Sequence, residues 1–388
     1  MKLPLKYSVR SLFVRRGTVL MTIASVAFVV LVYVGVLSLA GGLAEAFGTS
    51  GDPANVIVLR DGALSESSSF FSLETGRELM ALPGVARDPE GMPLASGEVI
   101  ILNNLPRKDG STSNVTFRGV GPASFALRPA LRMADGRRFE PGRAELIVGQ
   151  GLAGRFPGLR LGNEVTVGQL TFRVVGVFEA DRSAYESEVW GAAEDLSNAF
   201  RRGGYYSSVV LHTNSPAEAQ ALVDRIEGDQ RFKLHARSEA EYYALQTANT
   251  TRQFILLANA LAIIMAFGAC FAAANTMYAA VSARSREIAA LRVLGFRRRS
   301  IVGAFLLESA LLGLVAGLIG VLLALPLNMI SAGTTNFVTF SEITFSLRTS
   351  PGVLLGGVVL AVLTGLLGGL PPAWSAARRS IAEGMRSV

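Results

Sequence analysis

The chain has 388 residues, half of them hydrophobic, with a mean hydropathy of +0.39 and a net charge of +7. Such a composition indicates several membrane-spanning segments. The basic excess does not point to nucleic acid, because residues 41–253 contain 22 Lys and Arg against 26 Asp and Glu. The positive charge therefore lies beside the hydrophobic runs, and no nucleic acid partner is expected. The single cysteine, Cys270, excludes an intrachain disulfide.

The first predicted element is a transmembrane helix over residues 18–40, in a segment (residues 1–40) that begins with a cytoplasmic N-terminus. Residues 1–16 carry basic but no acidic side chains, and Thr18–Ala40 is uncharged. A helix of that length extends about 35 Å, enough to cross about 30 Å of hydrocarbon. A cleaved signal peptide is the alternative, but its apolar region would be only about 7–15 residues long. We therefore predict a retained span that starts in the cytoplasm.

Residues 41–253 are predicted to form one large α+β domain outside the cytoplasm. Each end of the region has a strand–helix–strand pattern, and we expect the two patterns to pack together as a membrane-proximal α/β subdomain. The first pattern comprises strands at 55–59 and 98–102 with a helix at 73–82. The second comprises strands at 208–212 and 232–236 with a helix that Ser215 caps and Gly228 ends. Between them, β-type runs at 114–120, 145–148, 164–167 and 171–178 predict a β lobe inserted at about residues 114–200.

Residues 254–388 are predicted to hold three more spans. A capping box at Ser238–Glu241 starts a helix that meets no breaker before the uncharged run 254–283. The third span covers residues 301–325 and the fourth residues 353–374, and a charged island at about 283–299 separates the second span from the third. The fold class is thus a membrane protein, an α-helical four-span bundle with a large α+β extracytoplasmic domain inserted between the first and second spans.

The distribution of basic residues predicts the orientation in the membrane. Five basic residues precede the first span, six lie in the island and three in the C-terminal tail, against one in the loop between the third and fourth spans. Short loops rich in Lys and Arg stay in the cytoplasm. Both termini and the island should therefore be cytoplasmic, and residues 41–253 extracytoplasmic.

The charged island is predicted to form a short amphipathic helix. Ile288, Leu291 and Leu294 recur every three residues and predict a narrow apolar stripe, and Gly295 is well placed to end the helix. Glu287, at the edge of the stripe, needs a cationic partner, either Arg284 or a residue of another protein. Two interpretations stay open on the pattern: a helix that passes motion to the adjoining spans, or an interfacial helix resting on lipid headgroups.

Other chemistry-bearing residues favour structural roles. None of the four lysines follows a glycine, which excludes a Walker-A loop and predicts that the chain is not itself an ATPase. His212 and His235 stand singly, so no metal site is expected, and Glu186 with Glu188 is interpreted as part of a solvated loop. In the third span, Glu308 is predicted to pair with an island arginine rather than to relay protons.

Several motifs together resemble those of MacB/FtsX-like ABC permeases. The island residues 286–295, followed by Phe305–Glu308, resemble the family's cytoplasmic signature, and residues 372–378 with 384–386 resemble its C-terminal motif. Residues 136–139, 147–149, 161–162 and 174–178 are similar to its periplasmic core. Ser380 and Gly384 depart from the family pattern in the tail, where proline and alanine are usual.

The resemblance implies a mechanotransmission permease of the bacterial inner membrane that works as a dimer, with a second copy or a paralogue. A separate ABC ATPase dimer would bind ATP and Mg²⁺, so no cofactor is expected in this chain, and a periplasmic adaptor is a further candidate partner. The island would be the coupling helix that contacts the ATPase through Arg284, Glu287, Ile288, Leu291, Arg292 and Gly295, with Glu308, Gly313 and Gly317 serving packing and the ion pair. Export is the implied function; the alternative is a signalling permease that activates an extracytoplasmic partner such as a cell-wall hydrolase.

Overall fold

The computed structural model describes residues 16–229, 231–335 and 341–378. Within it the chain divides into two compact units. Unit 1 comprises the described residues up to Gly41, Arg252–Ile330 and the described residues from Leu347 onward. Unit 2 comprises Gly42–Thr251 and Ser331–Ser346. The basic N-terminal segment and the tail positions Arg379, Ser380, Gly384 and Arg386 lie outside the described residues.

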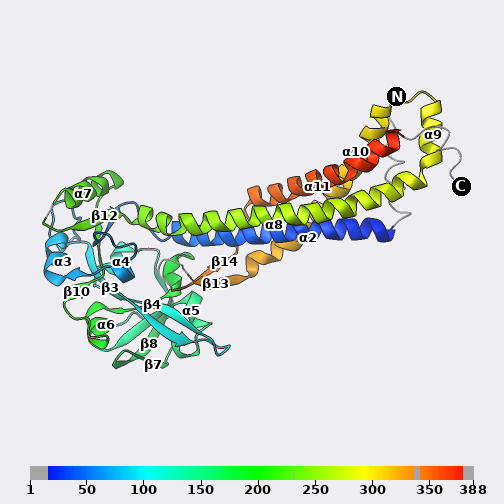
Figure 1. The fold of residues 1–388 in the computed structure, drawn as a ribbon. Helices are drawn as coiled ribbons and strands as arrows, with labels where there is room; N and C mark the ends of the chain where they lie inside the picture. The colour runs from blue at the N-terminus through cyan, green and yellow to red at the C-terminus, as the bar shows by residue number, and fades with distance from the viewer. Residues whose placement is uncertain (1–15, 230, 336–340, 379–388) are drawn as a thin grey trace. The chain divides into compact units, whose positions relative to one another are not determined.

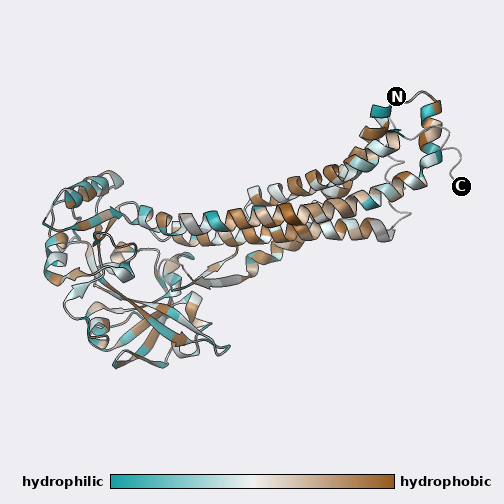
Figure 2. Ribbon diagram, in the orientation of Figure 1, coloured by the Kyte–Doolittle hydropathy of each residue, from teal (hydrophilic) through white to brown (hydrophobic). Residues whose placement is uncertain are grey.

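Unit 1 is helical. Within the described residues, four helices are long and apolar enough to cross a membrane: α2 (Arg16–Gly48), α8 (Glu239–Ala283), α10 (Arg298–Ala324, continued by the 3-10 helix η5, Leu325–Met329) and α11 (Pro351–Arg378). Hydrophobic residues dominate along all four (Figure 2). The short helix α9 (Ser285–Val293) joins α8 to α10. The four-span prediction is confirmed.

The helix α8 confirms that one element continues from unit 2 into unit 1. It starts at Glu239, directly after Ser238, whose hydroxyl accepts the backbone N–H of Glu241 at 3.2 Å. It then runs to Ala283 without a proline. The hydroxyl–amide bond is the one that a capping box predicts, so the sequence correctly locates the beginning of this helix.

Unit 2 is built on one mixed sheet of described strands, in the order β12-β1-β11-β3-β4-β9-β6-β8-β5, with β7 paired to β8. Its strands are β1 (Asn55–Arg60), β3 (Ala95–Pro106), β4 (Thr112–Val120), β5 (Arg132–Gly136), β6 (Glu145–Gly149), β7 (Glu164–Val167), β8 (Leu170–Glu179), β9 (Glu188–Ala192), β11 (Ser208–His212) and β12 (Leu234–Ser238). Two small two-stranded sheets are separate, one of β2 (Phe71–Ser72) with β10 (Tyr205–Tyr206) and one of β13 (Ser331–Thr335) with β14 (Glu342–Ser346). The remaining helices are α3 (Leu73–Met80), α4 (Ser124–Leu127), α5 (Gln150–Ala153), α6 (Ala193–Ala199) and α7 (Pro216–Gly228), with the 3-10 turns η2 (Glu66–Ser68), η3 (Pro157–Leu159) and η4 (Ala184–Ser187).

The two predicted strand–helix–strand patterns do pack together. Strand β1 pairs antiparallel with both β11 and β12, and α3 and α7 close a core that includes Val56, Leu79 and Leu222. We call this the α/β lobe. Ser215 caps α7 by accepting the backbone N–H of Glu218, and Pro216 occupies the first turn, as the sequence indicates.

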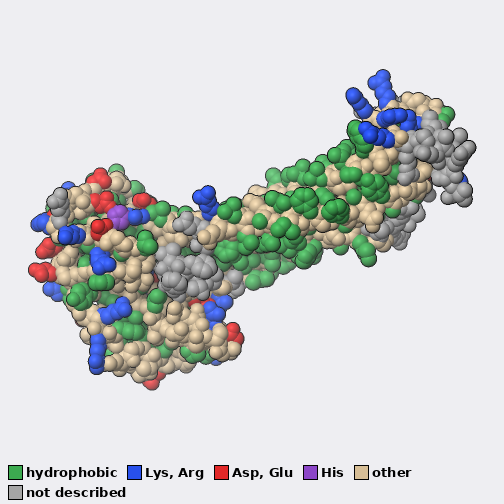
Figure 3. All heavy atoms as spheres, in the orientation of Figure 1, with side chains coloured by type: hydrophobic (Ala, Val, Ile, Leu, Met, Phe, Trp, Pro, Cys, Tyr) green, Lys and Arg blue, Asp and Glu red, His purple; other side chains and the backbone are tan. Residues whose placement is uncertain are grey.

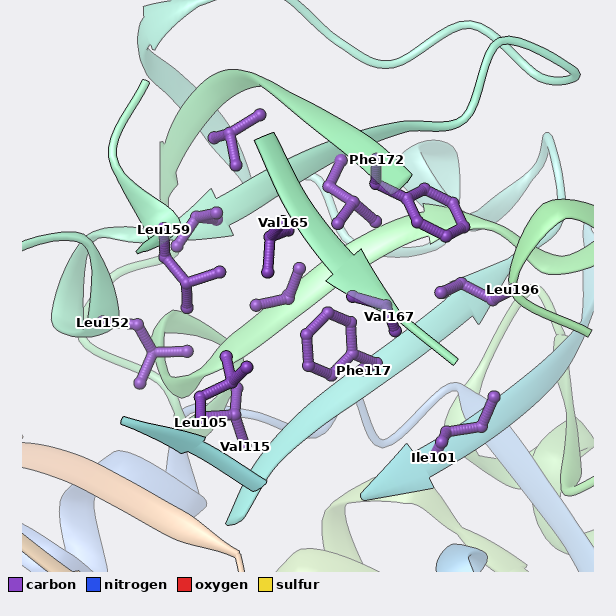
Figure 4. Packing of buried hydrophobic residues seen from close by; sticks show 14 of the residues in the cluster. Ile101, Leu105, Val115, Phe117, Leu152, Leu159, Val165, Val167, Phe172 and Leu196 are labelled. Carbon is purple, nitrogen blue, oxygen red and sulfur yellow. The ribbon is translucent and has the colours of Figure 1, made fainter. Parts of the chain in front are cut away.

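The β lobe comprises β4 to β9, and it shares the sheet with the α/β lobe. The long strand β3 pairs with β11 on one side and with β4 on the other, so the sheet is continuous across both lobes. Figure 4 shows the core of the β lobe, where Phe117, Phe172, Val165 and Leu159 converge from different elements. Phe117, Val165 and Phe172 alternate with polar side chains along β4, β7 and β8, which is the period-2 pattern that predicts strands, whereas Leu159 comes from η3.

Two expectations about irregular segments are wrong. Glu188, interpreted as part of a solvated loop, lies on β9 and is 8% exposed. Its strand pairs in parallel with β4 and antiparallel with β6, so it is central in the sheet. The segment between the third and fourth spans, expected to be a loop, forms the β13–β14 hairpin.

Candidate coupling helix

The helix α9 ends in a Schellman motif built around Gly295. The Phe296 N–H donates to the Leu291 carbonyl at 3.1 Å, and the Gly295 N–H donates to the Arg292 carbonyl at 3.1 Å. Gly295 has φ +87°, a left-handed conformation that costs other residues about 1–2 kcal/mol. Nothing lies within 4 Å of the position that its Cβ would take, so the backbone conformation alone explains the glycine.

The two faces of α9 differ in burial. Ser285, Ile288 and Ala289 are buried within unit 1, whereas Val293 is 62% and Leu294 is 73% exposed. Arg286 and Glu287 are also exposed, on the same side as these two apolar residues. The exposed face thus combines an apolar end with charged residues one to two turns earlier.

The predicted apolar stripe does not remain on one face. Ile288 is buried, Leu291 is half-buried and Leu294 is exposed. A spacing of three residues rotates each successive side chain by about 60° around a helix of 3.6 residues per turn. The stripe therefore winds from the buried side of α9 to the exposed side, so Leu294 is the most exposed of the three and Leu291 is partly accessible.

Two arginines connect α9 to neighbouring helices. Arg284 Nη1 lies 3.2 Å from Glu308 Oε2 on α10, where Glu308 is 2% exposed. Arg292 Nη1 donates to the carbonyl oxygen of Ala377, in the last turn of α11, at 3.2 Å. A cation at a helix C-terminus is favoured by the helix dipole. The helix is thus bonded to α10 at its beginning and to α11 near its end.

The helices α10 and α11 approach each other closely through small residues. A Cβ on Gly313 would lie 2.6 Å from the Ala361 carbonyl oxygen, and one on Gly317 would lie 2.9 Å from Ala361 Cβ. Both glycines are buried. This close backbone approach is the geometry that small-xxx-small patterns allow in membranes.

Among the described residues, no group of three His, Cys, Asp or Glu is arranged to hold a metal ion. His212 Nδ1 lies 2.7 Å from Asn55 Oδ1, and His235 Nδ1 lies 2.5 Å from Glu227 Oε1. Both histidines therefore have polar partners.

Figure 3 shows Lys and Arg gathered at the end of unit 1 that holds α9 and the start of α10, whereas hydrophobic side chains cover the long helices.

A second charged cluster, which the sequence patterns did not reveal, is buried in unit 2. Arg118 and Arg128 lie there among four glutamates. The available signal was a charge directly beside a large apolar residue in a β-type run, as in Phe117-Arg118 and Glu188-Val189. A charge in such a position is buried only with a partner, so each one implies a partner without identifying it.

Comparisons with known proteins find matches along most of the chain. The family model described as MacB-like periplasmic core domain matches residues 19–229, and the model described as FtsX-like permease C-terminal matches residues 259–381. The macrolide export ATP-binding/permease protein MacB of Sodalis glossinidius is 25% identical over 416 residues, which cover 99% of this chain and 60% of that protein. The pyoverdine export ATP-binding/permease protein PvdT of Pseudomonas entomophila is 25% identical over 305 residues, 74% of this chain and 44% of that protein.

A solved structure is also similar in part. The periplasmic region of MacB from Actinobacillus actinomycetemcomitans covers 48% of this chain and 89% of its own, with 13% identity and a TM-score of 0.37. The chain spans about 60% or less of the length of the two curated relatives above. Because the MacB-like core model alone covers more than half of the sequence and the FtsX-like model follows it, the chain belongs to the MacB/FtsX-like family of ABC transporter permeases.

Proposed function

We propose that this chain is the permease subunit of an ABC exporter, driven by an ABC ATPase on another polypeptide. The family supports an export-type permease, and the two relatives described above are named for the export of a macrolide and of pyoverdine. The absence of a glycine–lysine pair from the sequence supports ATP and Mg²⁺ binding by the partner rather than by this chain. The ATPase would act as a dimer beneath two permease copies.

The exposed face of α9 is the observation that carries the proposal. Val293 and Leu294 are large apolar residues held in water or at the membrane surface unless another protein covers them. In this proposal Glu287, Leu291 and Leu294 contact the ATPase. Arg284, Ile288 and Arg292 orient the helix through their bonds and packing within unit 1, and Gly295 sets the turn into α10.

The proposed location is the bacterial inner membrane, with both termini and α9 in the cytoplasm and unit 2 outside it. The uneven distribution of basic residues among the short loops supports this orientation. ATP hydrolysis would then move α9, and the bonds from α9 to α10 and α11 would carry that movement into the spans. Cargo recognition falls to the extracytoplasmic domain, because Glu308, near one end of its span, is the one charge within the predicted spans of the sequence.

A charge placed on the exposed face of α9 tests the proposal. Leu294→Asp puts an unpaired carboxylate into an apolar contact, which should weaken ATPase binding by about tenfold or more. The measurement is co-purification of an ABC ATPase from native-host membranes, identified by mass spectrometry, together with ATP hydrolysis by the complex. Leu64→Asp is the matched control, since Leu64 is also exposed, at 83%, but lies in unit 2. Equal ATPase recovery with both variants would remove α9 from the interface.

A further inference from the structure

Unit 2 contains an ionic network of six side chains, all buried. Arg118 on β4 and Arg128 after α4 are 2% and 5% exposed, and the four glutamates are 8% exposed or less. The glutamates come from separate parts of the chain: Glu66 in η2, Glu98 on β3, Glu188 on β9 and Glu239 at the first position of α8. The network therefore joins the α/β lobe, the β lobe and α8.

Arg118 is the centre of the network in the sheet. Its Nη1 and Nη2 donate to the two oxygens of Glu66 at 2.8 and 2.9 Å, and its Nε and Nη2 donate to those of Glu188 at 2.7 and 2.9 Å. Its Nη1 also reaches Glu98 Oε2 at 2.6 Å. Such paired, planar contacts are specific to the guanidinium group and fix its orientation.

Arg128 links that centre to α8. Its Nη1 donates to Glu98 Oε1 at 2.7 Å, and its Nη2 lies 3.2 Å from Glu239 Oε1. Glu239 also accepts from the Tyr185 hydroxyl at 2.8 Å, from Asn55 Nδ2 at 2.8 Å and from the Asp52 backbone N–H at 3.2 Å. One carboxylate at the start of α8 thus receives bonds from four donors on three segments, residues 52–55, Arg128 and Tyr185.

The end of α2 lies beside the same place. Gly51, just after α2, packs so closely on α8 that a Cβ there would lie 2.6 Å from Ala240 Cα. The Phe47 ring contacts the Tyr243 ring with centroids 6.1 Å apart, and Tyr185 stacks edge-on against Tyr243 at 5.7 Å. Two of the candidate membrane-spanning helices therefore end or begin against this network.

Stability alone is a poor reason for this arrangement. Burying charges costs desolvation energy that a well-made ion pair roughly repays, and apolar replacements of such networks are often as stable. The network does fix the relative positions of its side chains, because each planar guanidinium group donates hydrogen bonds in fixed directions. Such a device matters most where parts of a protein have to move as one body.

We propose that Glu239 is a positioning residue that locks the first turns of α8 to both lobes of unit 2, so that displacement of α8 moves the lobes with it. The source of that displacement rests on the proposed function, whereas the lock itself does not. Without the lock, α8 could shift or fray at its beginning while the sheet stayed in place. With it, Arg128 and Tyr185 carry the displacement into the β lobe, and Asn55 carries it into the α/β lobe.

Hydrogen exchange on the full chain in lipid nanodiscs tests the lock without any ATPase. Glu239→Gln keeps the shape of the side chain but loses the charge, and Tyr185→Phe removes one donor to Glu239. Exchange of the backbone amides of residues 243–248 should become about tenfold faster in Glu239→Gln, while exchange in β9 and β11 stays unchanged. The increase in exchange rate should be smaller in Tyr185→Phe. Glu241→Gln, at an exposed position in the same turn, should match the wild type.

A second arm measures transmission in cells that also express the ATPase. Glu239→Gln should still recover the ATPase but lose export, whereas Glu241→Gln should keep both. Exchange at residues 243–248 within twofold of the wild type, or an equal increase across the whole of unit 2, would overturn the lock. Wild-type chain that recovers no ATPase would overturn the proposed function instead, and the nanodisc arm would still decide the lock.

Discussion

Two glutamates that share Arg118 have pKa values shifted in opposite directions. Burial alone would raise the pKa of Glu98, but Arg128 and Arg118 together lower it below its ordinary value of 4.5. Burial also raises the pKa of Glu188, and its bonds to Arg118 offset that only in part. The difference is physical, since Glu98 has two guanidinium groups beside it and Glu188 has one.

The two residues should therefore give pH dependences of opposite sign. The stabilisation from Glu98 is complete above pH 4.5, its unfolded pKa, and is lost as the pH falls through the lower folded pKa. For Glu188 the folded pKa lies above 4.5, so stability falls as the pH rises from 4.5 through that value.

Melting temperatures of the purified chain between pH 3 and pH 8 measure both effects. We expect Glu98→Gln to have a lower melting temperature than wild type, by a difference that shrinks as the pH falls below 4.5. For Glu188→Gln the difference in melting temperature should shrink as the pH rises above 4.5. Two deficits that change with pH in the same direction would show that the shared arginine does not discriminate between these carboxylates.

At the residue scale, an ion pair can be predicted from the sequence when its two residues are close along the chain or lie at the same depth in the membrane. Glu308 lies near the end of its span that adjoins the arginine-rich island, which is why a pair with the island follows from the sequence; the structure has Arg284 there at 3.2 Å. Arg118 and Glu188 are 70 positions apart and meet only because β4 pairs in parallel with β9. No local pattern contains that pairing, so the buried network could not be predicted.

Among the helices, the contact between α10 and α11 depends on glycines that have no room for a side chain. Gly313→Leu should force α10 and α11 apart, because its Cβ would overlap the Ala361 carbonyl. Overpacking of this kind costs about 1–3 kcal/mol and should lower the melting temperature in detergent by about 2 °C or more.

The same helix supplies the control for that prediction. Gly303→Leu places the same side chain on α10 where nothing lies within 4 Å of the new Cβ, and it should leave the melting temperature unchanged or higher. Equal losses from both substitutions would mean that lipid exposure rather than close packing explains the effect.

At the element scale, long periodic segments are predictable and short non-local ones are not. The four long helices follow from uncharged runs and caps, and β7 is predicted with its observed bounds because its polar and apolar residues alternate. β9 was missed because its Glu188 indicates a polar, solvated segment until Arg118 is placed beside it. The sequence does not predict the β13–β14 hairpin, because a connection between two spans is expected to be a loop and, among the described strands, β13 and β14 pair with each other alone.

For the whole molecule, the orientation across the membrane can be measured with single cysteines in a Cys270→Ser background. Suitable positions are exposed: Ser68 and Asn214 in unit 2, and Ser282 at the end of α8. In cells with a permeabilised outer barrier, a membrane-impermeant maleimide should label Ser68→Cys and Asn214→Cys, and it should label Ser282→Cys only after lysis. Labelling of Ser282→Cys in intact cells would contradict the four-span orientation. Buried residues such as Ser65, Thr213 and Ser285 would be unsuitable.

The length of α8 has a consequence for the surrounding lipid. Its uncharged part, residues 253–283, is about 46 Å long at 1.5 Å per residue, whereas the hydrocarbon core is about 30 Å thick. The uncharged part is thus about 16 Å longer than the hydrocarbon core. The helix has to tilt, or the extra length has to be covered by protein or by a locally thicker bilayer, each at a small free-energy cost per ångström. Acyl-chain length is thus a thermodynamic variable for this protein, and thicker membranes should favour the states in which α8 stands more upright.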